Sequence, residues 1–531
     1  MRAMKMKKAI SITRLLPVVM MVVVALLLSV TAYAAAPGIT GPTFNLIAQA
    51  AQITQPDGQM IYSWGYGCNG APSGFAPAAI TGASCSSMQV PGPTLIVTEG
   101  QTVTVNLTNG LPLAAGSTSI LFPGFNVVAT GGAAGLLTKE AAPGGTVTYT
   151  FTASSPGTRA YYSGTQSDLQ VEMGMYGAII VLPAAVPPAC TGGLAASNLV
   201  AESTAGESDF RLAAAAYDHP KSCYDREYLF QFSEMDPNIH RKAQEQVALA
   251  APACSSGAST PGCSLNVPTE PYHPAYFLIN GRSMPDLMDP NYAAEYPHQP
   301  YNGNPHMHPG EQVLLRVIGQ GRWQHPFHEH ANHVRILARD GNLILTPDGT
   351  ALAGPLLFTT TTTPGLAMDG IFYYTGRGLN WDMYGHNPGS SDAGAKLPCV
   401  PDANGYNTGD PTAINYYEWC QDHNKPLQAS PFGDVAGGGP VTLPDPNLFT
   451  NGAWFGGSPY LGPDATVRAT GPTGTTPPSG TIANSPTGEA GFAFMWHSHN
   501  EREITTNNIF PGGMMMMMLV DSREFVINES N

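Results

Sequence analysis

The sequence predicts an all-β protein of Greek-key β-sandwich domains, and three observations support this fold class. Glycine (59 residues) and proline (48) are abundant in the 531-residue chain, whereas only 11% of the residues are charged. This balance favours short strands and turns over helices. Apolar and polar residues alternate in several stretches, as they do in half-buried strands. One strand–loop–strand pattern also occurs twice.

The clearest alternation lies in the first third of the chain. Val103, Val105 and Leu107 alternate with polar residues after a turn at Gly100. The stretch TVTYTFTA, residues 146–153, repeats the alternation. Both stretches therefore predict antiparallel strands that bury one face in a sandwich.

The repeated pattern joins an aromatic strand to a strand that begins with Gly-Met. AYYSG (residues 160–164) leads through a loop into GMYGAIIV (174–181), and MWHSH (495–499) leads into GMMMMMLV (513–520). The same order at two places predicts two domains of one fold.

The predicted domains cover residues 38–185 and 271–525. Between them, residues 186–270 contain four cysteines, and we interpret this stretch as a disulfide-containing linker. Residues of about 377–487 are rich in Gly, Pro, Asn and Asp and predict a long loop insertion in the second domain, which is often functional at such a length. An alternative division places a third domain in this region.

The N-terminus predicts export. Residues 1–34 contain basic residues, an apolar run and the small-residue cleavage pattern Ala32-Tyr33-Ala34, which together are typical of a signal peptide. No other segment approaches the ~20 apolar residues of a membrane span, so we expect none. The protein is therefore expected in the periplasm or outside the cell.

The cysteines and the net charge limit the chemistry. Eight cysteines form four sequential neighbours, which in an exported protein predict local disulfides. The neighbours are Cys68/Cys85, Cys190/Cys223, Cys254/Cys263 and Cys399/Cys420. A formal net charge of -15 argues against a nucleic-acid partner, since phosphate binding needs clustered cations.

Two short histidine motifs predict a metal site. HPFHEH contains His325, His328 and His330, and WHSH contains His497 and His499. Residues i and i+2 of a strand face the same side, so each motif projects a histidine pair. If the two strands are neighbours, four imidazoles converge with His325 nearby, and such a cluster suits copper, zinc, iron or nickel.

Several motifs together resemble the multicopper oxidase family, whose domains are cupredoxin-like. They are VPGPTLIVTEG, PGTRAYYSG with GMYGAIIV, FLINGR, HPFHEH, and WHSH with GGMM. The resemblance covers about 40–185 and 270–525. It implies two cupredoxin-like domains, a type 1 copper that takes electrons from substrate, and a three-copper cluster that reduces dioxygen.

The residues match this family only in part. The resemblance assigns His325 to the type 1 centre, but Ser498 stands in place of its cysteine and Glu503 in place of its second histidine. Cluster ligands are implied at His328, His330, His497 and His499. In the first domain the family's HxHG is LFPG and its YHSH is YYSG, so those cluster ligands are absent.

We therefore expect one or two copper ions at the C-terminal histidines, with zinc as the alternative metal, and no type 1 copper. Three functions stay open: residual oxidoreductase activity, non-enzymatic copper binding or storage, and a structural role. Whether the protein is an enzyme is left undecided. The family's two-domain members form trimers, so the resemblance offers a homotrimer, but the missing first-domain ligands leave the oligomeric state open.

Other residues carry weaker signals. Glu501 and Glu503 can add a carboxylate, although a solvated loop is the simpler interpretation. His306 and His308 form a second HxH pair, which is a weak indication of a second metal site. The run from Met514 to Met518 offers soft ligands for Cu(I), but its match to GMYGAIIV favours a buried strand.

Overall fold

A computed structural model describes residues 35–191, 207–377, 399–410, 416–421, 457–460, 491–521 and 527–529. The predicted signal peptide and most of the predicted insertion lie outside the described residues. Strands dominate the described chain and helices are few, which confirms the all-β prediction. No helix in the described part is long and apolar enough to cross a membrane.

The first half of the chain forms two five-stranded sheets. One has the order β11 (Gly157–Tyr162), β12 (Tyr176–Leu182), β5 (Leu95–Thr98), β1 (Gly38–Thr40) and β4 (Phe75–Ala76). The other has the order β3 (Met60–Cys68), β2 (Thr43–Thr54), β6 (Thr102–Asn109), β10 (Thr146–Thr152) and β7 (Val128–Gly131). A small ribbon pairs β8 (Ala133–Ala134) with β9 (Lys139–Glu140).

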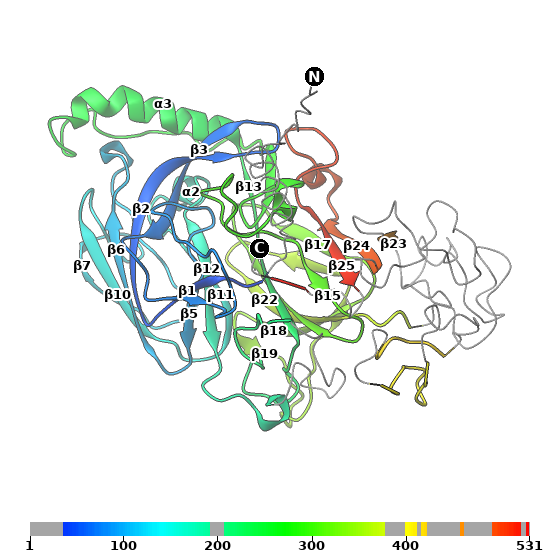
Figure 1. Ribbon diagram of the computed structural model, residues 1–531. Coiled ribbons are helices and arrows are strands. Elements are labelled where there is room, and N and C mark those ends of the chain that lie inside the picture. Colours follow the sequence, from blue (N-terminus) through cyan, green and yellow to red (C-terminus); the bar gives the residue numbers. More distant parts are fainter. Residues whose placement is uncertain are drawn as a thin grey trace, which may run out of the picture.

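The second half forms a seven-stranded and a six-stranded sheet. The larger contains β14 (Tyr276–Ile279), β13 (Arg226–Met235), β16 (Gln312–Gly319), β22 (Ala367–Tyr373), β18 (Val334–Arg339), β19 (Asn342–Leu343) and β20 (Leu356–Leu357). The smaller contains β15 (His306–Met307), β25 (Met515–Asp521), β24 (Gly491–Ser498), β17 (His325–Glu329), β21 (Thr359–Thr362) and β23 (Gly457–Tyr460). Figure 1 shows the two halves side by side.

The helices are short, with one exception. They are α2 (Ser167–Gln170), α3 (Pro237–Cys254) and the 3-10 helices η2 (Leu113–Ala115), η3 (Pro188–Cys190), η4 (Asp286–Met288) and η6 (Glu501–Ile504). The side chain of Asp236 caps α3 by accepting from the backbone of Asn238. Ile239 and Ala243 of α3 join the core of the first half, so this helix covers that half (Figure 1).

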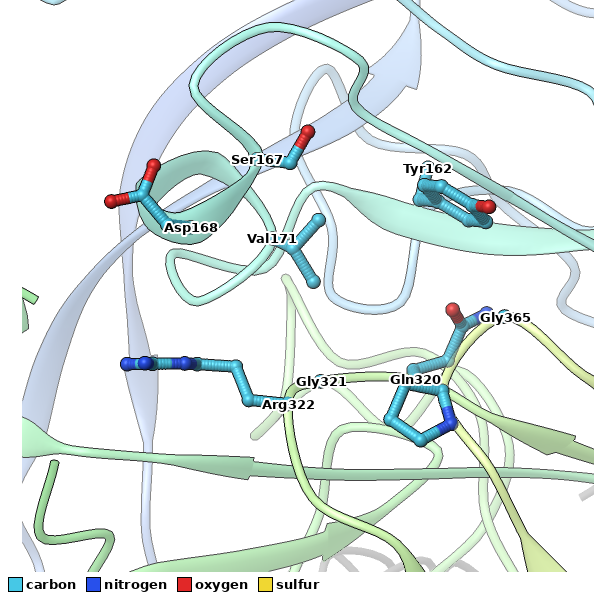
Figure 2. Close-up of a pocket in the computed structure, with 9 residues that line it drawn as sticks. Tyr162, Ser167, Asp168, Val171, Gln320, Gly321, Arg322 and Gly365 are labelled. Carbon is cyan, nitrogen blue, oxygen red and sulfur yellow. The ribbon is translucent and has the colours of Figure 1, made fainter.

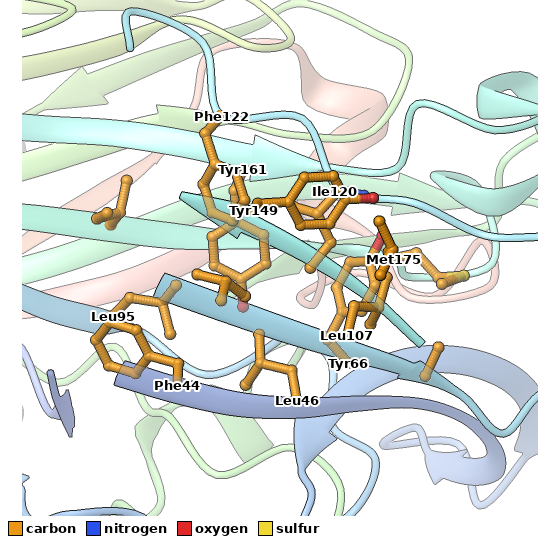
Figure 3. Close-up of a cluster of buried hydrophobic side chains, with 14 of the residues drawn as sticks. Phe44, Leu46, Tyr66, Leu95, Leu107, Ile120, Phe122, Tyr149, Tyr161 and Met175 are labelled. Atoms are coloured by element: carbon orange, nitrogen blue, oxygen red, sulfur yellow. The ribbon is translucent and has the colours of Figure 1, made fainter. Parts of the chain in front are cut away.

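Each half encloses its own core. In the first half, Val103, Val105 and Leu107 are fully buried, and β6 pairs antiparallel with β10 as the alternation predicts. Figure 3 shows part of this core, with aromatic and aliphatic side chains between the sheets. The second core holds Phe327 and Trp496 together with alternate methionines of β25.

Part of the predicted linker belongs to a sheet, which corrects the interpretation of residues 186–270. β13 pairs parallel with β16 and antiparallel with β14, and all ten of its residues are buried. The sequence pattern did not indicate this strand, because it contains the polar residues Glu227 and Glu234. Both are buried beside partners from distant segments. The other domain limits stay predictions.

The two halves meet through the seven-stranded sheet. Ala160 and Ile180 of the first half pack against Leu229 and Ile318 of the second. The Thr158 hydroxyl donates to Asp369 at 2.6 Å. All four predicted disulfides form: Cys68–Cys85, Cys190–Cys223, Cys254–Cys263 and Cys399–Cys420.

Candidate metal centre

Neighbouring strands bring the two histidine motifs together. β17 pairs antiparallel with β24, and His328 lies directly opposite His497 in the register. Because alternate residues of a strand share a face, His330 projects on the same side as His328. The condition for the histidine pairs to converge, that the two strands are neighbours, is therefore met.

Three imidazoles form a compact group. One ring nitrogen of each of His328, His330 and His497 lies within 4.8 Å of the others, a spacing that can hold a metal ion. The Nε2 atoms of His330 and His497 are 3.1 Å apart. All three side chains are buried.

His499 lies at the rim of this group. Its ring centroid is 4.8 Å from that of His328 and 5.7 Å from that of His497. Its side chain is 51% exposed, and Glu501, 3.8 Å away, is 83% exposed. The solvated-loop interpretation therefore holds for Glu501, and His499 forms the solvent-facing edge of the group.

Hydrogen bonds orient the rings. The Nδ1 atom of His328 lies 2.6 Å from the Thr359 hydroxyl on β21. The Nδ1 atom of His497 lies 2.7 Å from the Ser498 carbonyl oxygen, and Trp496 donates its indole N–H to the His330 carbonyl oxygen. Such outer partners fix ring orientation at metal sites, and nothing in the sequence pointed to Thr359.

The environment keeps two of the rings neutral. Burial, followed by the nearby His497 and His499, lowers the pKa of His328 to about 4. Burial also lowers the pKa of His497. Because a metal binds neutral imidazole, these donors fit a metal without a large proton penalty at neutral pH.

His325 does not join this group of three, and its role as a metal ligand stays a prediction. Its Nδ1 atom lies 2.8 Å from Glu503 and its Nε2 atom lies 2.8 Å from Glu234. Burial alone would lower the pKa of His325, but hydrogen bonds to both carboxylates outweigh it and raise the pKa to about 9. Both ring nitrogens of His325 therefore face carboxylates in this structure.

The type 1 position does not fit copper. Ser498 and Glu503 are hydrogen-bonded to each other, and the described chain contains no free cysteine. Without a thiolate these residues cannot form a blue copper centre. Glu503 is 1% exposed, so the solvated-loop interpretation is wrong for this residue.

In the first half, residues other than histidine occupy the positions where the family has its cluster ligands. Leu121 pairs with Tyr162 through backbone hydrogen bonds, and a side chain at Gly164 would strike Leu121. Tyr162 instead lines a cleft of about 300 Å³ between the halves, opposite Gln320 and Gly365 (Figure 2). This cleft brings no set of metal ligands together.

The HxH pair formed by His306 on β15 and His308 directly after it belongs to a buried ion-pair network. His306 lies 2.6 Å from Asp521, and His308 lies 3.1 Å from Glu207. Arg226 forms ion pairs with three buried carboxylates: Glu207, Glu311 and Glu529. His308, Glu207 and Glu311 lie close enough to hold an ion, but Arg226 already supplies the cation there. The arrangement fits ion pairing better than a second metal site.

The methionine run is core. Met514, Met516 and Met518 are fully buried and pack with Phe327 and Trp496. The buried-strand interpretation is therefore confirmed for these residues.

Comparisons with known proteins agree with this picture. A family model described as multicopper oxidase matches residues 82–185. An L-ascorbate oxidase of Brassica rapa subsp. pekinensis is 36% identical over 96 residues, which are 18% of this chain and 16% of that protein.

Two solved structures were also matched over most of the chain. The multicopper oxidase mgLAC is 15% identical with a TM-score of 0.43, and the match covers 90% of this chain and 86% of that one. The blue copper oxidase from Nitrosomonas europaea is 16% identical with a TM-score of 0.42, covering 90% and 85%. Residues 82–185 therefore match a multicopper oxidase domain, and the chain is similar to this family over that part.

Proposed function

We propose that this is an exported copper-binding protein whose metal site is the group of His328, His330 and His497, with His499 at its rim. The convergence of three buried ring nitrogens within 4.8 Å carries the proposal. We expect one or two Cu2+ ions at this site, and zinc is the alternative metal because imidazole donors suit both. Four disulfides support an oxidising location outside the cytoplasm.

The residues of the site have distinct roles. His328, His330 and His497 bind the ion, while Thr359 and the Ser498 carbonyl oxygen hold two of the rings in place. A bound copper ion with an open position supplies a Lewis acid and a one-electron redox centre. The exposed edge at His499 leaves this position accessible to small molecules.

The replacement of the type 1 ligands favours binding or storage of copper over oxidase activity. Ser498 and Glu503 stand where electrons would enter, so any residual oxidoreductase activity has to begin at the histidine group itself. Storage predicts bound copper without turnover of phenols, metal ions or nitrite. Turnover that His497→Ala abolishes would instead establish the residual activity.

The metal site is tested by mass spectrometry and paramagnetic resonance after copper loading. We expect bound Cu2+ in the wild type and loss of it in the double variant His330→Ala, His497→Ala. His333→Ala is the matched control, because this exposed histidine follows the same motif and packs on Phe358 outside the group. Equal copper content in the wild type and the double variant would refute the proposal. If the protein retains zinc in preference to copper, zinc replaces copper as the proposed metal.

A further inference from the structure

A single carboxylate oxygen fills the point where the three type 1 positions converge. The Oε2 atom of Glu503 lies 2.8 Å from Nδ1 of His325 and accepts a hydrogen bond from the Ser498 hydroxyl at 2.5 Å. All three side chains are buried to 1% exposure or less. The replaced centre is therefore a closed hydrogen-bond network within the protein.

A second carboxylate completes this network. Glu234 on β13 lies 2.8 Å from Nε2 of His325 and accepts from the Tyr272 hydroxyl at 3.1 Å. The backbone N–H groups of Arg322 and Trp323 also donate to Glu234, at 2.7 and 2.9 Å. Buried charges are tolerated only when they are paired and hydrogen-bonded, and both conditions are met here.

The network is joined to the strands that carry the histidine group. Ser498 stands between His497 and His499 on β24, and His325 begins β17, which carries His328. Glu503 lies on η6, directly after the histidine motif, and its backbone carbonyl accepts from Met514 of the returning strand. The Asn500 amide also donates to Glu503 at 2.8 Å. Glu503 therefore fastens the end of β24 and the following turn to β17.

We propose that Glu503 is a positioning residue for the histidine group: through Ser498 and His325 it sets the separation of β24 and β17, and hence of His497 from His328 and from His330, which directly follows β17. A type 1 metal would hold the same three positions together, and here a carboxylate does so. The consequence for copper affinity rests on the proposed function, whereas the consequence for ring geometry does not.

The first test measures copper. Glu503→Gln keeps the size of the side chain but removes the charge that pairs with His325. We expect about 10-fold weaker Cu2+ binding, the lower end of the range for groups that hydrogen-bond a metal ligand directly, together with a changed paramagnetic resonance spectrum. Glu311→Gln is the matched control, because Glu311 is equally buried and ion-paired but belongs to the Arg226 network. Its copper spectrum should equal that of the wild type.

The second test uses the metal-free protein. It therefore tests the positioning role even when the wild type binds no copper and the proposed function fails. The 15N-labelled ring resonances of His330 and His497 should move in Glu503→Gln and stay unchanged in Glu311→Gln. Unmoved ring resonances in Glu503→Gln, or wild-type copper affinity and spectrum in that variant, would overturn the positioning role.

Discussion

Nδ1 of His325 lies 2.8 Å from Oε2 of Glu503. A type 1 copper bound by His325 would require a cysteine thiolate as a further ligand. With Glu234 on the other nitrogen, the imidazole lies between two carboxylates. These two carboxylates hold His325 in an ion-paired network beside the histidine group.

The ion pair predicts a pH dependence of stability. His325 has a pKa of about 9 in the folded protein and about 6.5 when unfolded. Because folding raises this pKa, its contribution is complete below about pH 6.5 and is lost as the pH rises through about 9, by up to about 3 kcal/mol. Urea unfolding across this range should show the loss, and His325→Gln should largely remove it. An equal slope in that variant would contradict the prediction.

The orientation of His328 is expected to depend on Thr359. Thr359→Val keeps the shape but removes the hydroxyl 2.6 Å from Nδ1, so the affinity for Cu2+ should fall about 10-fold. Titration calorimetry measures the change. Thr361→Val, at an exposed position on the same strand, should bind copper as the wild type does. Equal affinities for the two variants would exclude an orienting role.

Met516 is expected to act through packing. It is fully buried beside aromatic side chains, so Met516→Ala should lower the free energy of unfolding by about 2–5 kcal/mol. Met517→Ala, at a partly exposed position, should cost less. Chemical denaturation gives both values. We expect Met516→Ala to leave Cu(I) binding unchanged. Loss of Cu(I) binding in this variant would show that the thioether is a copper ligand.

Arg226 is expected to be essential for the fold. Its removal leaves buried Glu207, Glu311 and Glu529 without their cation, and breaking such a network costs about 3–5 kcal/mol. Thermal unfolding of Arg226→Gln should show this loss. Arg241→Gln breaks an exposed pair with Glu245, and its melting temperature should be nearly unchanged. Similar small losses in both variants would show that the buried network adds little.

The sequence by itself determined the fold class, the disulfide pairs and the histidine pairs. Those features are local: alternation sets which residues share a face, and sequential cysteines are near in space because little chain separates them. The absence of a type 1 cysteine was equally readable, because Ser498 stands inside the motif.

Only the tertiary structure decided which charged residues are buried and what they contact. Glu234 reaches His325 across 91 residues of chain, and Arg226 meets Glu529 across 303. No local pattern encodes such partners, because a buried charge becomes stable only when distant strands supply its counter-charge and hydrogen bonds. For the same reason Glu503, which looked like a loop residue, became the centre of the network.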